Sequence, residues 1–242
     1  SGKSSVFRLL LNIYRPTEGA VLVDDVSVPQ IDPLCLRRHI GYVPQDVILF
    51  HGDIRDNIVM GATDISDADI LYAIKLAGLD ETLAQMPEGL STQVGERGER
   101  LSGGQRQTVA VARALVRKPK LLLLDEPSSA MDPATEQNLI RNLRSLTDTT
   151  LILITHRTAM LPLVDRLVVF ANGSIVMDGP REEVMHLLTQ DVQRPRINPD
   201  NKGGPSSAKA VSGGGGPKPV PGNSGRAKPL PKNVETISKK RA

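Results

Sequence analysis

Two stretches near the middle of the chain most constrain its fold, Leu101–Gln105 and Leu121–Pro127. The second stretch opens with four consecutive leucines, which is typical of a strand buried on both faces of a parallel sheet. Such a strand carries the residues after it to the carboxyl edge of the sheet, where ligands bind in α/β proteins. Here those residues are Asp125 and Glu126, two adjacent carboxylates. The sequence therefore predicts an α/β fold with a ligand site at this sheet edge.

The two carboxylates suit different tasks. Asp125 offers the hard oxygen ligand that Mg²⁺ prefers, and Glu126 could accept a proton from a water molecule. Upstream, Ser102 and Gln105 have the spacing of a capping box, which predicts a helix beginning at the two glycines between them. A helix that begins in this way leaves backbone N–H groups available to an anion.

These stretches resemble the ABC family of ATPases. Leu101–Gln105 matches the family's signature motif in full, and Leu121–Pro127 matches its Walker B strand with the catalytic glutamate, Glu126. Both motifs occur in the family's order and at its spacing, which is far more specific than either motif alone. The plainer interpretation, a capped helix before an ordinary buried strand, leaves this joint pattern unexplained.

The first residues of the chain resemble the end of a phosphate-binding loop, the Walker A motif, of which Gly2, Lys3 and Ser4 are present. The resemblance implies that Lys3 reaches the β- and γ-phosphates of ATP and that the Ser4 hydroxyl binds Mg²⁺. The backbone N–H groups of Gly2 to Ser5 would face the phosphates. We expect the motif to be truncated here, without the N-terminal strands of the family's sheet, and a sheet lacking its central strand exposes backbone groups.

Three further positions match the family's site motifs. Gln45 follows a predicted strand over 40–43 at the Q-loop position, which implies contact with Mg²⁺ and the attacking water. His156 follows a predicted strand over 151–155 at the H-loop position, which implies contact with the γ-phosphate. Asp132 stands at the D-loop position and is also predicted to cap the helix after it. The alternative for each is an ordinary role as a solvated loop residue, a structural histidine or a helix cap.

Residues 1–190 are predicted to form one truncated ABC ATPase domain, with a helical subdomain at about 55–118. The stretch 45–58 resembles the exporter branch of the family, and residues 94–99 resemble its X-loop, which senses the transmembrane domain. Elsewhere the patterns predict a first helix through Ile13, a hairpin turning at Asn172–Gly173 and a last helix over 180–188.

Beyond Asp191 the composition changes to Pro, Gly, Ser and Lys, so residues 191–242 are predicted to be a disordered basic tail. This tail holds eleven Lys or Arg and three Asp or Glu, a net charge of +8, which leaves −5 for residues 1–190. The overall charge of +3 is therefore no sign of nucleic-acid binding by the folded part, and no nucleic-acid partner is expected. For the tail itself, attraction to anionic lipid or nucleic acid and an inert solvated segment are both open.

The resemblance implies the ATP-binding and ATP-hydrolysing domain of an exporter. Two such domains would close head-to-tail on two ATP molecules. Each would offer its signature residues to the nucleotide of the other, and these are Ser102, Gly103, Gly104 and Gln105. The Q-loop and X-loop would contact a transmembrane domain. The resemblance implies a domain at the cytoplasmic face of a membrane, the bacterial inner membrane in particular. No apolar run here is long enough to span a membrane.

Within the exporters, Ile58–Ala62 and residues 93–99 are similar to bacterial type I secretion ATPases, which export unfolded proteins. One alternative is a soluble ABC ATPase acting on DNA or ribosomes. The chromosome-type members of that group carry long coiled coils, whereas fewer than 100 residues without heptads separate Lys3 from the signature here. The other alternative is a catalytically dead fragment. The intact Glu126 and His156 argue against decay by substitution, whereas the truncated Walker A motif argues for loss of activity in this chain as given.

Overall fold

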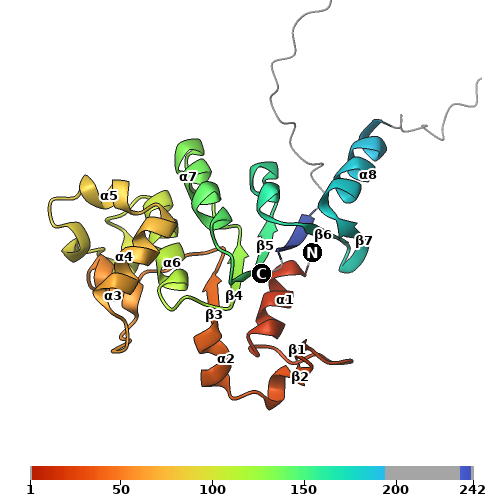
Figure 1. Cartoon of the computed structure of the whole chain (residues 1–242), viewed down its shortest axis with the longest axis horizontal. Coiled ribbons are helices and arrows are strands. Elements are labelled where there is room, and N and C mark those ends of the chain that lie inside the picture. The colour runs from red at the N-terminus through yellow and green to blue at the C-terminus, as the bar shows by residue number, and fades with distance from the viewer. Residues whose placement is uncertain (1, 194–234, 241–242) are drawn as a thin grey trace, which may run out of the picture.

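The computed structural model describes residues 2–193 and 235–240, which form a mixed sheet flanked by helices (Figure 1). In this part of the chain the main sheet has six strands, in the order β3-β4-β5-β8-β6-β7. Strands β3, β4 and β5 run parallel, whereas β6, β7 and β8 pair antiparallel with their neighbours. The predicted α/β fold is confirmed. The strand bounds are β3 Ile40–Val43, β4 Leu121–Asp125, β5 Thr150–Thr155, β6 Arg166–Ala171, β7 Ser174–Pro180 and β8 Glu235–Lys240.

Strand β4 is buried on both faces, as its run of leucines predicts. Leu122 and Leu124 belong to the larger hydrophobic core, whereas Leu123 belongs to a second core on the opposite face of the sheet. That second core includes Phe7 of helix α1 (Lys3–Leu10). Because β4 lies between β3 and β5 in parallel, the three carboxyl ends meet at one edge of the sheet.

Four helices form a lobe beside the sheet, at the left of Figure 1. Helix α6 packs against α3, α4 and β3, and nearly all of its residues from Gln107 to Leu115 are buried. Capping boxes begin α3 at Asp53, α4 at Ser66 and α6 at Ser102. The bounds are α3 Ile54–Val59, α4 Asp67–Ala77, α5 Asp80–Ala84 and α6 Gly103–Leu115.

The other helices surround the sheet. Among the described residues, no helix combines the length and the apolar character needed to cross a membrane. The α-helices are α2 Pro33–His39, α7 Pro133–Arg144 and α8 Arg181–Gln193, and the 3₁₀ segments are Val28–Gln30, Gly89–Ser91, Glu96–Gly98 and Thr158–Leu163. A separate hairpin pairs β1 (Leu22–Val23) with β2 (Val26–Ser27).

The first helix is shorter than its sequence pattern predicts. It ends at Leu10, not after Ile13, because Asn12 adopts a left-handed backbone with φ of 55°. The N–H groups of Ile13 and Tyr14 then turn back to the carbonyl of Arg8, at 2.8 and 3.1 Å. The apolar spacing continues past the real end of the helix, so periodicity alone places that end wrongly.

The prediction of a disordered tail over 191–242 is wrong at two places. Helix α8 continues to Gln193, and Glu235–Lys240 forms strand β8 between β5 and β6. Its register joins Ile237 to Ile154 on one side and to Val168 on the other. Strand edges on both sides supply partners for the backbone N–H and C=O groups of β8, which composition alone could not reveal. The prediction for 194–234 and 241–242 lies outside the described residues.

Candidate functional site

The N-terminus of α1 and the carboxyl end of β4 meet at the sheet edge. The Ser4 side chain hydrogen-bonds the Asp125 carboxylate, and the buried Lys3 lies close enough to act on the same carboxylate electrostatically. Gly2 precedes α1 with φ of 89°, and no side chain in the described part of the chain caps this helix. The N–H of Ser5 donates to the Gly2 carbonyl at 3.1 Å. A cation, a hydroxyl and an uncapped helix start therefore surround Asp125.

Asp125 is nearly fully buried at the end of β4. Burial raises the pKa of its carboxyl above the ordinary value, while Ser4, Lys3 and Arg8 act in the opposite direction and Asp46 adds to the rise. A buried carboxylate of this kind gains from a further cation, because opposite charge offsets its lost hydration. Its surroundings therefore fit a divalent cation. The influence of Asp46 also places the loop after β3 near the same carboxylate.

Glu126 follows Asp125 in an unusual backbone conformation, with φ of 51°. Its N–H donates to the Ile154 carbonyl at 2.9 Å, which fixes the residue against β5. Its Oε1 lies 2.8 Å from Nδ1 of His156, the residue after β5. Its Oε2 is buried and has no hydrogen-bond partner among the described residues. Buried carboxylate oxygens are rarely left without a partner, so Oε2 marks a place for a water or ligand group.

Some of the predicted site residues lie together at the sheet edge, and others lie apart from them. The structure brings Lys3, Ser4, Asp125, Glu126 and His156 to one region of the sheet edge. Gln45 is exposed two residues beyond β3, at the same edge, and among the described residues its side chain forms no hydrogen bond with that group.

The signature residues lie on the helical lobe, where the predicted capping box is confirmed. The Gln105 N–H donates to Ser102 Oγ at 3.2 Å, and the Ser102 N–H donates to Gln105 Oε1 at 2.8 Å. Gly103 and Gly104 face the loop after β4: a Cβ on Gly103 would lie 2.9 Å from that of Ala130. Ser102 itself is exposed, so the start of α6 presents a polar surface outward.

Asp132 caps helix α7, as its position before Pro133 predicts. Its carboxylate accepts hydrogen bonds from the N–H groups of Ala134 and Thr135, at 2.9 and 3.0 Å. The Thr135 hydroxyl also donates to it at 2.6 Å, and this bond is the main reason that the pKa of Asp132 lies below its usual value. The role as a helix cap is confirmed, and the role in a D-loop stays a prediction.

Two groups of residues that hold the loop after β4 were missed by the sequence analysis. Gln107 of α6 bonds three positions of the loop, and Arg157, next to His156, donates to the Ser128 carbonyl at 2.9 Å. Arg157 also pairs with the buried Glu136 at 2.8 Å. One usable signal for Gln107 was its position four residues after Gly103, on the same helix face.

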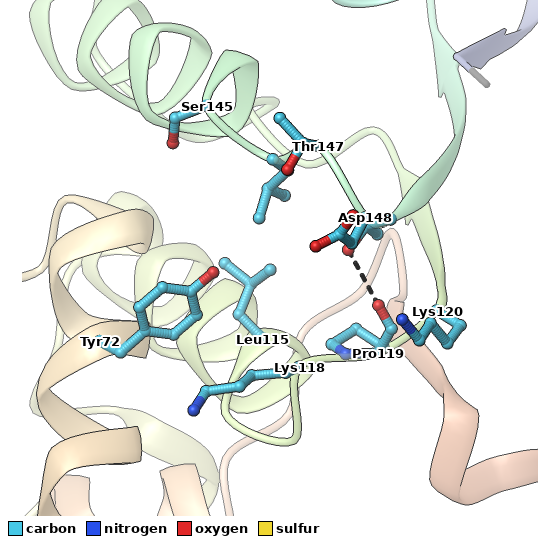
Figure 2. Close-up of a pocket in the computed structure, with 10 residues that line it drawn as sticks. Tyr72, Leu115, Lys118, Pro119, Lys120, Ser145, Thr147 and Asp148 are labelled. Atoms are coloured by element: carbon cyan, nitrogen blue, oxygen red, sulfur yellow. Dashed lines mark hydrogen bonds between the residues drawn. The ribbon is translucent and has the colours of Figure 1, made fainter. Parts of the chain in front are cut away.

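A pocket of about 290 Å³ lies at the other end of the strands and is separate from this site (Figure 2). Tyr72, Leu115 and Lys118 of the helical lobe line it on one side, and residues 145–149 line it on the other. Lys120 and Thr149 directly precede β4 and β5, so the pocket lies at the amino edge of the sheet. Lys118 is already paired with Asp69 at 2.6 Å.

The fold and the site together define an ATPase domain of the phosphate-binding-loop class, and the comparisons with known proteins specify the family. A family model described as "ABC transporter" matches residues 1–129. This chain therefore belongs to the ABC transporter family, and its fold is that of the ATP-binding domain.

Individual relatives agree with the family. YfiB of Bacillus subtilis, an uncharacterized ABC transporter ATP-binding protein, is 41% identical over 185 residues, which cover 76% of this chain and 32% of YfiB. The leukotoxin translocation ATP-binding protein LktB of Mannheimia glucosida is 42% identical over 186 residues, which cover 76% of this chain and 26% of LktB. A bacterial Atm1-family ABC exporter solved with ATP bound has a TM-score of 0.73 at 38% identity. The match covers 77% of this chain and 33% of the exporter chain. The chain spans about a third or less of the length of these proteins.

Proposed function

We propose that this domain binds and hydrolyses ATP and that hydrolysis powers export across a membrane. The observation that carries the proposal is the Glu126 carboxylate, whose Oε1 contacts His156 while the buried Oε2 is unpartnered among the described residues. A carboxylate held in this way can accept a proton from an attacking water. The relatives support the export role, since LktB is named for leukotoxin translocation and the solved neighbour is an exporter.

The phosphates of ATP would lie at the start of α1. Lys3 would neutralise the β- and γ-phosphates, and the backbone of Gly2 to Ser5 would face them at the positive end of the helix dipole. Ser4, Gln45 and Asp125 would hold Mg²⁺, which would supply neutralisation of the phosphate charge. The donor set fits this ion, because Mg²⁺ prefers hard oxygen ligands and is commonly bound by one or two carboxylates, here Asp125, together with substrate phosphates.

Most of the rate enhancement would come from positioning and charge neutralisation. Glu126 would orient the water and take its proton, while Gln45 would direct the same water from the neighbouring loop. His156 would contact the γ-phosphate from the end of β5. Because its Nδ1 is directed to Glu126, one histidine could align both the carboxylate and the phosphate.

A second copy of the domain would complete the site. The start of α6 would face the partner's nucleotide, and Ser102, Gly103, Gly104 and Gln105 would contact its phosphates in a head-to-tail dimer. Asp132 would lie at the same interface. In support, the capping box leaves Ser102 exposed at the surface of the lobe.

A groove of about 550 Å³ suits the transmembrane partner. Val47 and Ile48, which follow the Q-loop position, line it together with Glu96, Arg97 and Glu99 of the X-loop. Nearby in the sequence, Phe50 is 57% exposed and Ile48 is 48% exposed, so apolar surface is available beside the groove. We propose that this groove receives a segment of a transmembrane domain. The ATP-binding domain itself would then lie at the cytoplasmic face of the membrane. Unfolded protein is the proposed cargo class, as in type I secretion.

The test compares wild-type protein with Glu126→Gln, and Glu183→Gln on the exposed face of α8 serves as a matched control. Wild type and control should hydrolyse ATP, whereas Glu126→Gln should lose at least about 100-fold in kcat and retain ATP in a dimer on a sizing column. A folded wild-type protein that binds no ATP would overturn the proposal. Equal rates for wild type and Glu126→Gln would remove Glu126 from the mechanism.

A further inference from the structure

Gln107 is a buried amide on α6 whose hydrogen-bonding groups are directed to one loop. Its Nε2 donates to the Glu126 carbonyl at 3.3 Å and to Ser129 Oγ at 2.6 Å. Its Oε1 accepts from the Ala130 N–H at 2.9 Å. The side chain is 4% exposed, so these bonds form away from competing water.

The backbone that Gln107 holds is strained. A residue other than glycine at positive φ is uncommon, and such conformations persist only where the surroundings enforce them. Glu126 has φ of 51°, and its N–H and its carbonyl are held from different sides. The N–H is fixed by Ile154 of β5, and the carbonyl accepts from Gln107 and from the Ser129 N–H at 3.2 Å. Gln107 is thus the link between the backbone of Glu126 and α6.

The same face of α6 begins at the signature glycines. Added Cβ atoms would lie 2.9 Å from the Ala130 Cβ at Gly103 and 3.1 Å from the Ala130 carbonyl oxygen at Gly104. Gln107 follows these glycines by four and three residues, so it lies one turn further along the same face. The start of α6 therefore packs against the segment Glu126–Ala130, and the Gln107 amide hydrogen-bonds the same segment.

We propose that Gln107 is a positioning residue that holds the backbone of Glu126 in its catalytic orientation and joins it to the signature helix. The inference rests on the proposed ATPase function. Gln107 acts through Glu126 and does not touch the nucleotide. Its removal should therefore lower the rate of hydrolysis and leave the affinity for ATP unchanged.

Variants at Gln107 should still fold, because the other side of the loop has its own supports. Arg157 donates to the Ser128 carbonyl and pairs with Glu136, and the Ser128 hydroxyl donates to the same Glu136 oxygen at 2.5 Å. The N–H of Glu126 stays bound to β5. Loss of Gln107 would free only one side of the segment.

The first test is Gln107→Met, which keeps the length of the side chain and removes its hydrogen bonds. We expect kcat to fall about tenfold with KM for ATP within about twofold of wild type. Thr149→Val is the matched control, because it removes one buried hydrogen bond, to the Pro119 carbonyl, at the far edge of the sheet. Wild-type kcat in Gln107→Met would overturn the inference, as would an equal loss in both variants.

The second test is Gln107→Glu, read as a pH profile. The carboxylate that this substitution introduces could, when ionised, accept from Ala130 but could not donate to Glu126 or Ser129. Burial raises the pKa of a carboxyl group, and its protonated form recovers one donor. The ratio of variant to wild-type kcat should therefore increase several-fold as the pH is lowered from 8 to 6. A constant ratio would show that donation to this loop is irrelevant to catalysis.

The third test needs no hydrolysis, so it separates this inference from the proposed function. Amide hydrogen exchange in nucleotide-free protein should be about tenfold faster at Ala130 in Gln107→Met than in wild type or Thr149→Val. If wild type bound no ATP but exchange at Ala130 were still faster in Gln107→Met than in wild type, the proposed function would fail and the positioning role would stand. If wild type hydrolysed ATP but exchange at Ala130 were unchanged, Gln107 would not hold the loop.

Discussion

Nδ1 of His156 lies 2.8 Å from Oε1 of Glu126, although thirty residues separate the two in sequence. The contact follows from the sheet, because Glu126 follows β4, His156 follows β5, and the two strands pair in parallel. The Glu126 side chain is 10% exposed and that of His156 is 63% exposed. The histidine can therefore reach a ligand in solution while it orients a carboxylate that is largely shielded from it.

His156→Ala is expected to reduce kcat for ATP by about 100-fold. The variant loses both the proposed phosphate contact and the group that orients Glu126, while Lys3 and the start of α1 still bind nucleotide. Single-turnover hydrolysis and ATP binding should be measured together. His186→Ala on α8, which is exposed and far along the chain, is the control and should match wild type. Equal loss of ATP binding and kcat in His156→Ala would argue against a catalytic contact.

The sequence predicted those parts of the fold that depend on local pattern. The leucines of β4, the capping box of Ser102 and Gln105, and the Asn172–Gly173 turn each specify their own structure, and each is confirmed. Both turn residues have positive φ, 51° and 81°, as a tight hairpin turn requires.

The missed features depend on contacts between distant segments. Strand β8 forms because two strand edges lie beside it, and no local pattern in a Pro- and Gly-rich tail signals those edges. The buried Gln107 and the Arg157–Glu136 pair are ordinary polar residues on helix and loop until the fold brings their partners close. The proximity of Glu126 and His156 was predictable because each follows a strand of the parallel sheet. The residues that hold the loop after β4 were not predictable, because they depend on the packing of α6 and α7 against that loop.

Asp125→Asn should raise the thermal stability of the metal-free protein at pH 7.5 while it abolishes Mg²⁺-dependent hydrolysis. Burial raises the folded-state pKa of Asp125 above that of the unfolded chain, so the folded protein binds the proton more tightly. Stability from this group is therefore present at low pH and is lost as the pH rises through the folded-state pKa. Asparagine does not ionise, so it removes this loss of stability at high pH. Its side-chain oxygen can still accept the hydrogen bond from Ser4.

The measurement is Tm in EDTA, for wild type and variant, from pH 7.5 downward. The gain should be about 2–4 °C at pH 7.5 and should shrink as wild-type Asp125 takes up its proton. A gain that grows on acidification would contradict the sign of the pKa shift. Asp148→Asn, an exposed site at the other edge of the sheet, should show no comparable change.

Ile237→Pro should loosen the sheet between β5 and β6. Proline lacks an N–H and disfavours the centre of a sheet, and position 237 pairs with both Ile154 and Val168. Amide exchange along β5 and β6 should become faster, and Tm should fall by several degrees. Ile237→Val retains the N–H and should resemble wild type. Unchanged exchange in the proline variant would show that β8 does not stabilise the sheet in solution.

Arg113 on α6 is a partly buried cation that joins the helical lobe to the loop after β3. Its guanidinium donates to the Asn57 carbonyl at 2.7 Å, to Asn57 Oδ1 at 2.8 Å and to the Ile48 carbonyl at 3.2 Å. The same group packs over an aromatic ring, with its Cζ 5.6 Å from the ring centroid of Phe50. The three oxygen acceptors are all neutral, and burial lowers the pKa of Arg113 to about 10.

Arg113→Lys should therefore destabilise the fold by about 2–3 kcal/mol, because one ammonium group cannot reproduce the planar fork that reaches Asn57 and Ile48 together. Urea unfolding measures the change, and Arg141→Lys, on the exposed face of α7, should cost under about 0.5 kcal/mol. The loss should be constant from pH 6 to pH 8, since a pKa of about 10 keeps the group charged throughout. A loss no larger than that of Arg141→Lys would show that the fork contributes little to joining the lobe to this loop.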